Sequence, residues 1–212
     1  MVRIQDIFND KKLVSEIKEK LPKLFKIAEI ESSRADKIGM EVGSLREKII
    51  VALLIYKFGE SQVNTKIPIT EPEADVVLED KPISIKTITG SGGIKAVWTV
   101  DAQSAKQFIN NYKPKCDMIL IQINWGLEKD GFFLIPLKVQ QEIFDSLGRE
   151  KYLQMPKAGT NPRGVEFSKD SISKMLNNKE TLKIKINWRS EIKDFNVYER
   201  WVDYWSGNIR LD

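Results

Sequence analysis

A short hairpin pattern constrains the fold of this chain more than any other feature of its sequence. Two strand-forming runs, 74–78 and 83–88, flank a charged turn, which is typical of a β-hairpin. A turn centred on Asp80-Lys81 places Asp75 directly opposite Lys86. Opposed side chains project from the same face of a sheet with Cβ atoms about 5 Å apart. The pattern therefore predicts a carboxylate and an ammonium group side by side on one sheet face.

The rest of the chain alternates between helical and strand-like patterns. The stretch up to about Ser33 predicts two helices separated near Pro22, and Leu45–Phe58 predicts a helix that ends at Gly59. Further helices are expected at 101–112, around 140–147, after the turn-rich loop 156–164 and in the aromatic tail. The predicted strands are Gln62–Ile69, Ala74–Glu79, Ile83–Ile88, Ala96–Val100, Met118–Asn124, Phe132–Leu137 and Leu182–Ile186. This order favours an α/β (α+β) fold with a mixed central sheet flanked by helices and an N-terminal helical segment.

The absence of histidine excludes several classes of site. The 212 residues include no histidine and a single cysteine, Cys116, which excludes Ser-His-Asp catalysis, His-ligated zinc and any Cys/His metal site within one chain. A metal here must be hard and oxygen-ligated, and we expect Mg²⁺ held by carboxylates, with Mn²⁺ as a substitute.

Charge and hydropathy set weaker bounds on partners and location. The net charge of +4, from 34 basic and 30 acidic residues, permits nucleic-acid binding without arguing for it. No apolar run reaches the roughly 20 residues that a membrane span needs. The N-terminus lacks an export segment, and the lone cysteine suits a reducing compartment. We therefore expect a cytoplasmic protein without a membrane partner.

Glu47 is the third group of interest, because it lies near the start of the helix that precedes the hairpin. Two structural roles compete with a functional one. Ser44 and Glu47 fit a capping box, and Asp75 with Lys86 fits an ordinary cross-strand ion pair. If Glu47 instead reaches the hairpin face, the three groups could hold Mg²⁺ and activate a water molecule.

Together, Glu47, Asp75 and Lys86 resemble the PD-(D/E)XK nuclease superfamily, specifically its type II restriction endonucleases. In that fold a helix carrying glutamate precedes a hairpin carrying aspartate and lysine, and the resemblance covers 44–112. Two positions depart from the family pattern. Ala74 replaces the proline before the aspartate, and Ser84 replaces the acidic residue two before the lysine. The missing carboxylate is assigned to Glu47, with Asp101 in reserve and Glu73 eligible only if its strand starts early. A literal match, Glu79-Asp80-Lys81, falls in the turn and is discounted.

The resemblance implies a Mg²⁺-dependent endonuclease that cuts both strands of duplex DNA at a short palindrome, as a homodimer without a nucleotide cofactor. Asp75 and Glu47 would hold the metal, Lys86 would position the attacking water, and Ser84 would assist by hydrogen bonding. Within a single nuclease domain, 1–212, we expect an N-terminal helical segment and loop (1–43), a catalytic core (44–137) and DNA-contact and dimer elements (138–212).

Each candidate DNA contact has a plain structural alternative. Asn161 and Arg163 could read base edges from the loop they share with Lys157, although that loop could equally be an ordinary surface loop. The glycine cluster beside Ser91 and Lys95 could approach a phosphate or form a flexible turn. Met40 could be a wedge between base pairs or pack in a core or dimer contact. The aromatic tail with Trp201 and Trp205 is expected to pack as a terminal helix or subunit interface.

Two other functions remain compatible with these residues. One is another nuclease of the same fold, such as a junction resolvase or repair nuclease. The other is a non-catalytic DNA-binding domain, in which Asp75–Lys86 is a salt bridge and Glu47 a helix cap.

Overall fold

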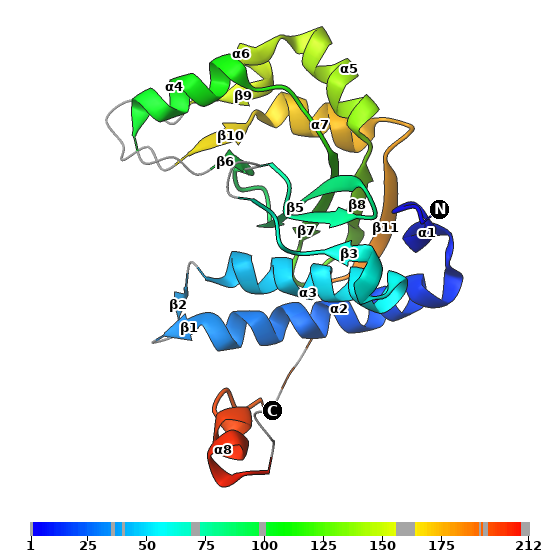
Figure 1. Cartoon of the computed structure of the whole chain (residues 1–212), viewed down its shortest axis with the longest axis vertical. Coiled ribbons are helices and arrows are strands. Elements are labelled where there is room, and N and C mark those ends of the chain that lie inside the picture. The colour runs from blue at the N-terminus through cyan, green and yellow to red at the C-terminus, as the bar shows by residue number, and fades with distance from the viewer. Residues whose placement is uncertain are drawn as a thin grey trace.

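A six-stranded mixed sheet forms the centre of the molecule (Figure 1). The computed structural model describes residues 2–34, 37–39, 41–68, 73–97, 101–155, 164–190, 192 and 195–208. The strand order is β11-β8-β7-β5-β4-β3. Only β5 and β7 pair in parallel within this sheet. The strands are β3 (Val63–Asn64), β4 (Val76–Leu78), β5 (Lys81–Thr89), β7 (Asp117–Ile123), β8 (Glu128–Ile135) and β11 (Leu182–Asn187). The expected mixed sheet between helices is confirmed.

Three N-terminal helices cover one face of the sheet (Figure 1). They are α1 (Asp6–Asn9), α2 (Lys11–Ser32) and α3 (Val42–Phe58), and the short strands β1 (Ser33–Arg34) and β2 (Lys37–Ile38) lie between α2 and α3. A 3-10 turn, η1 (Glu60–Gln62), follows α3. Phe25 of α2 and Ile50 and Leu54 of α3 share one core with Ile83 and Ile85 of β5.

The predicted helix break at Pro22 is wrong, because α2 runs through it. A proline inside a helix removes one hydrogen bond and costs about 3 kcal/mol. Along the helix, however, Leu13, Ile17, Leu21 and Phe25 repeat at helical spacing, and all are buried. Their burial along the whole helix outweighs the local cost of the proline.

The opposite face is covered by four helices and a three-stranded sheet of order β6-β10-β9. The helices are α4 (Ala102–Asn111), α5 (Leu137–Leu147), α6 (Arg149–Tyr152) and α7 (Lys169–Asn177); the strands are β6 (Lys95–Val97), β9 (Leu153–Gln154) and β10 (Val165–Phe167). Ile88, Met118, Leu120 and Tyr152 lie in this second core. Since both sheet faces are covered, the central strand β7 is apolar almost throughout.

One predicted strand is shorter than expected, and the C-terminal helix lies apart from the central sheet. Of the strand expected at Gln62–Ile69, the described residues form only β3, and Ile69 lies outside them. The C-terminal helix α8 (Glu199–Ser206) projects away from the central sheet (Figure 1). Among the described residues, no helix combines the length and hydrophobicity that a membrane span requires.

Candidate active site

The hairpin forms as expected, but its register differs from the prediction. Leu78 pairs with Lys81 and Val76 with Ile83, so the turn is centred on Glu79-Asp80 and not on Asp80-Lys81. Glu79 takes the left-handed conformation with φ of 52°, which a tight two-residue turn requires. The shift is two positions, and side chains alternate with a period of two, so Asp75 still projects from the same face as Lys86.

Asp75 stands where its strand separates from β5. Among the described residues, β4 pairs with β5 only as far as Ile83. Asp75 then donates its own N–H to the Ile83 carbonyl at 2.9 Å, and its Oδ2 accepts the Ile85 N–H at 2.6 Å. The carboxylate therefore takes the place of a missing strand partner and is fixed at an open edge of β5.

Two further donors reach the same oxygen of Asp75. Lys86 Nζ lies 3.2 Å and Ser84 Oγ 3.3 Å from Oδ2. Lys86 and Asp75 are both partly buried, whereas Ser84 is 1% exposed. The other oxygen, Oδ1, accepts no hydrogen bond from the described residues. Asp75 is thus held firmly through one oxygen while the second is free to bind a ligand.

Glu47 does not form the capping box that its sequence suggested. Helix α3 starts at Val42, three residues earlier than predicted, and Glu41 occupies its N-cap position without a side-chain cap. Glu47 therefore lies beyond the first turn and cannot reach back to a cap amide. No described residue hydrogen-bonds its carboxylate.

The electrostatics of Glu47 place it with the hairpin pair. Burial raises its pKa to about 7, repulsion from Asp75 adds to the rise, and attraction to Lys86 opposes it. Helix α3 packs on the Ile83–Ile85 face, while Lys86 alternates to the other face. Glu47 therefore lies close enough to Asp75 and Lys86 to interact electrostatically with both, from the helix that packs on the other face of β5.

The two reserve carboxylates have other roles in the structure. Asp101 is exposed and caps α4, accepting from the Ser104 N–H at 2.7 Å, and this bond is the main cause of its lowered pKa. The early strand start that Glu73 required does not occur, because β4 begins at Val76. Glu73 instead accepts from Tyr112 Oη at 3.1 Å. Burial raises the Glu73 pKa, although attraction to Lys86 is among the opposing effects.

Beside Glu47, sequence reasoning missed a buried ion pair. Arg46 Nη2 lies 2.5 Å from Glu29 Oε1, and both residues are less than 5% exposed. Arg46 Nη1 also donates to Thr89 Oγ1, at the end of β5, at 3.1 Å. Trp125 Nε1 donates to the same Glu29 oxygen at 2.8 Å. This cluster joins α2, α3 and the strand that carries Lys86. No local signal reveals it, because its members lie far apart in the chain.

The donor set suits a hard divalent cation. Within the described part of the chain, no three carboxylate or cysteine ligands gather in one place. Mg²⁺, however, is typically bound by one or two carboxylates, with water and substrate phosphate completing its shell. Glu47 and Asp75 supply two oxygen ligands whose mutual repulsion a cation would relieve, and Asp75 Oδ1 is available. The residues present therefore fit Mg²⁺.

Only two of the expected DNA-contact residues fall in described segments. Ser91 is exposed in the turn after β5, and Lys95 forms a 2.6 Å ion pair with Glu166. The remaining four, Met40, Lys157, Asn161 and Arg163, lie outside the described residues.

Comparison with known proteins bears on the family and the fold of the chain. Residues 7–207 match the family described as "Restriction endonuclease ThaI". A solved structure described as "Restriction endonuclease in complex with substrate DNA" superposes with a TM-score of 0.87 at 51% sequence identity, covering 96% of this chain and 99% of that one. No protein with curated annotation matches. The resemblance inferred from the sequence is confirmed, and the chain belongs to the ThaI family of restriction endonucleases.

Proposed function

We propose that this protein hydrolyses phosphodiester bonds in both strands of duplex DNA at a short palindromic sequence, in a Mg²⁺-dependent reaction. The observation that carries the proposal is the Asp75–Lys86 pair at the open edge of β5, held through Asp75 Oδ2, with Glu47 electrostatically coupled to both residues. If Asp75 and Lys86 formed only a structural salt bridge and Glu47 only a helix cap, Glu47 would not interact electrostatically with the hairpin. Family membership and the likeness to a DNA-bound restriction endonuclease support the same function.

Asp75 and Glu47 would hold the metal, with Mn²⁺ as a possible substitute. When bound, Mg²⁺ would polarise the scissile phosphate and acidify a bound water. Lys86 orients the attacking water and stabilises negative charge as it builds up on the phosphate. Ser84 and the Ile85 N–H keep Asp75 in place. Since burial gives Glu47 a pKa of about 7, metal binding must displace a proton from Glu47 below that pH.

The catalytic core is assigned to 44–137 and the DNA-contact and dimer elements to 138–212. We assign the duplex to the side of the chain that lies between the α2–α3 layer and α4 (Figure 1). Ser91 and Lys95 would contact the backbone, Lys157, Asn161 and Arg163 would reach the bases, and Met40 would insert as a wedge. Cutting both strands of a palindrome calls for a two-fold homodimer, with one site for each strand.

Cleavage of plasmid DNA with and without Mg²⁺ tests the proposal. Discrete fragments whose ends map to one palindrome, absent with EDTA, are the expected result. A branched-junction substrate run in parallel identifies a resolvase if it is cut in preference to linear duplex. Absence of cleavage under Mg²⁺ and Mn²⁺ across a range of pH and temperature would refute the proposal.

A further inference from the structure

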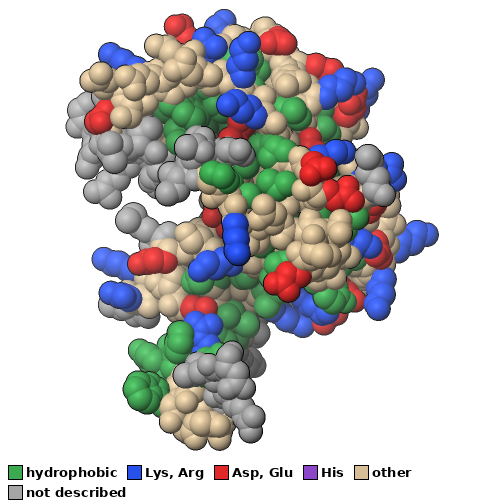
Figure 2. Space-filling view, in the orientation of Figure 1, with side chains coloured by type: hydrophobic (Ala, Val, Ile, Leu, Met, Phe, Trp, Pro, Cys, Tyr) green, Lys and Arg blue, Asp and Glu red, His purple; other side chains and the backbone are tan. Residues whose placement is uncertain are grey.

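Helix α8 exposes an apolar stripe that a single copy of the chain leaves uncovered. Tyr198, Trp201, Val202 and Trp205 recur at the i, i+3, i+4, i+7 spacing of one helix face. Their exposed fractions are 71%, 52%, 60% and 93%. Hydrophobic side chains gather on this helix at the edge of the molecule (Figure 2). Contiguous exposed apolar patches of this kind mark interaction sites.

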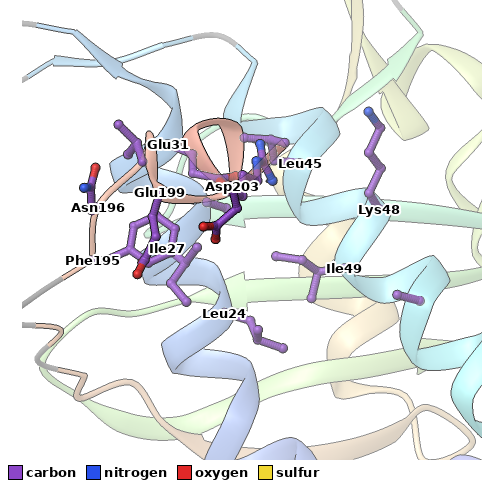
Figure 3. Close-up of a pocket in the computed structure, with 14 residues that line it drawn as sticks. Leu24, Ile27, Glu31, Leu45, Lys48, Ile49, Phe195, Asn196, Glu199 and Asp203 are labelled. Carbon is purple, nitrogen blue, oxygen red and sulfur yellow. Dashed lines mark ion pairs between the residues drawn. The ribbon is translucent and has the colours of Figure 1, made fainter. Parts of the chain in front are cut away.

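The orientation of α8 explains why its stripe is uncovered. Its opposite side faces the α2–α3 layer, where Arg200 Nη1 lies 3.3 Å from Glu31 Oε1. A pocket of about 550 Å³ separates the two parts, and Glu199 and Asp203 lie at it (Figure 3). The polar side of α8 is therefore turned toward its own chain, and the aromatic side away from it.

The outer face of the α2–α3 layer carries a second uncovered apolar surface. A groove of about 300 Å³ runs between the two helices, and its lining includes Leu24, Ile49, Leu53 and Tyr56. Leu24 is 41% and Tyr56 65% exposed. Helix α3 is apolar all round from Ile49 to Tyr56, a property of helices that are buried on every side. Of this run only Ile50 and Leu54 are fully buried against the sheet, whereas Ile49 and Leu53 are only partly buried.

We propose that α8 of one copy docks its aromatic stripe into the α2–α3 groove of a second copy, and reciprocally. Leu24, Ile49 and Ala52 line both the groove and the pocket beneath α8, so the two surfaces adjoin on one side of the chain. The Arg200–Glu31 contact turns the stripe away from the groove of its own chain. Exchange between two copies buries both surfaces through one isologous interface.

The charges on these surfaces also favour a second copy over DNA. Helix α8 carries Glu199, Arg200 and Asp203, a balance of one negative charge. Glu16 and Lys20 line the groove and pair with each other at 3.1 Å. DNA-binding surfaces are strongly basic, and neither surface has that property. This interface would join the two copies of the homodimer in the proposed function. It rests on that function, because cutting both strands of a palindrome requires two copies.

Sedimentation of the full-length chain without DNA tests the interface. The wild type is expected to dimerise at micromolar concentration. The α8 double variant Trp201→Glu/Trp205→Glu and the groove variant Leu24→Glu/Tyr56→Glu should each raise the dimer dissociation constant by about 100-fold or more, since buried aromatic anchors dominate interfaces. Leu127→Glu is the matched control, because Leu127 is 55% exposed outside both surfaces; it should leave the dimer unchanged.

Mixing the α8 variant with the groove variant distinguishes reciprocal exchange from packing of α8 against α8. The mixed pair retains one intact helix and one intact groove, so dimers should reappear where each variant alone is monomeric. Far-UV circular dichroism should match wild type throughout, because the substituted side chains are exposed in a single copy. A monomeric wild type, a groove variant that still dimerises, or a mixture that stays monomeric would overturn the proposal.

Plasmid cleavage by the same samples separates this proposal from the proposed function. A wild type that is dimeric but cuts no DNA would refute the function and leave the interface standing. A wild type that cuts DNA while remaining monomeric would overturn the interface alone.

Discussion

Two neighbouring residues of α3, Arg46 and Glu47, belong to charge clusters of opposite character. Arg46 is buried in a cluster where Glu29 receives its guanidinium and the Trp125 N–H. Glu47 shares its site with Asp75 and Lys86, has no hydrogen bond from a described residue, and has a pKa near 7. The first cluster pairs its one carboxylate with two cations, Arg46 and Lys26, and holds the helix in place. The second leaves two carboxylates with one lysine, an imbalance that a cation can correct.

The largest effect is expected at the second cluster. Asp75→Asn and Lys86→Met should each lower single-turnover DNA cleavage by about 1000-fold or more, because each removes charge at the reacting phosphate or its metal. Lys57→Met is the matched control. Lys57 lies on the same helix as Glu47, but it pairs with Asp10, at 2.6 Å, and not with the candidate site. Near-wild-type cleavage by either site variant would remove that residue from the catalytic group.

The next largest effect is a difference in stability between the loss of a buried ion pair and the loss of a partly exposed one. Arg46→Met should lower the free energy of unfolding by about 3 kcal/mol, because it removes the buried partner of Glu29 and leaves only the more exposed Lys26, 3.3 Å away, to balance that carboxylate. Lys57→Met breaks a partly exposed pair and should cost at most about 1 kcal/mol. Urea denaturation of both variants measures the difference. Equal losses would show that the Arg46 cluster is not a structural anchor.

A smaller effect, of opposite sign, is expected at Glu47. Its folded pKa of about 7 exceeds the ordinary value of 4.5, so ionising it favours the unfolded state. The resulting cost is absent below pH 4.5, grows from there to about pH 7 and is complete above it. Without metal, Glu47→Gln should therefore stabilise the protein by about 1–2 kcal/mol at pH 8.5 and leave it unchanged at pH 4.

Mg²⁺ should stabilise the wild type more than the Glu47→Gln variant. Added at pH 8.5, it should raise the melting temperature of the wild type more than that of Glu47→Gln, because binding to the folded state stabilises it. A Glu47→Gln variant that is less stable than the wild type at pH 8.5 without metal would contradict the pKa shift assigned to burial and to repulsion from Asp75.

The smallest effect is expected at Ser84. Its hydroxyl lies 3.3 Å from Asp75, the longest of the three bonds to Oδ2. Ser84→Ala should cost about 1 kcal/mol of stability and lower cleavage by no more than about 10-fold. A loss as large as that of Asp75→Asn would mean that Ser84 acts directly on substrate or metal.

Local rules predicted most of the secondary structure and the right face of the hairpin. Asp75 and Lys86 share a face in either register, because side chains alternate along a strand and the error was two positions. The apolar runs of β7 and β8 were likewise clear from sequence. Local rules failed at Pro22, where burial along α2 outweighed a helix breaker, and at the start of α3, which lies three residues before the predicted cap.

The sequence by itself determined the chemistry available to this protein. Without histidine and with one cysteine, only carboxylates and lysines can build a metal-assisted hydrolytic site. Tertiary structure alone decided which of its many carboxylates could serve. Asp101 became a helix cap, Glu73 bonded to Tyr112, and Glu47 came within electrostatic reach of Asp75 and Lys86. The reason is physical: residue type fixes what a side chain can bind, whereas burial and charged neighbours depend on segments that meet only when the chain folds.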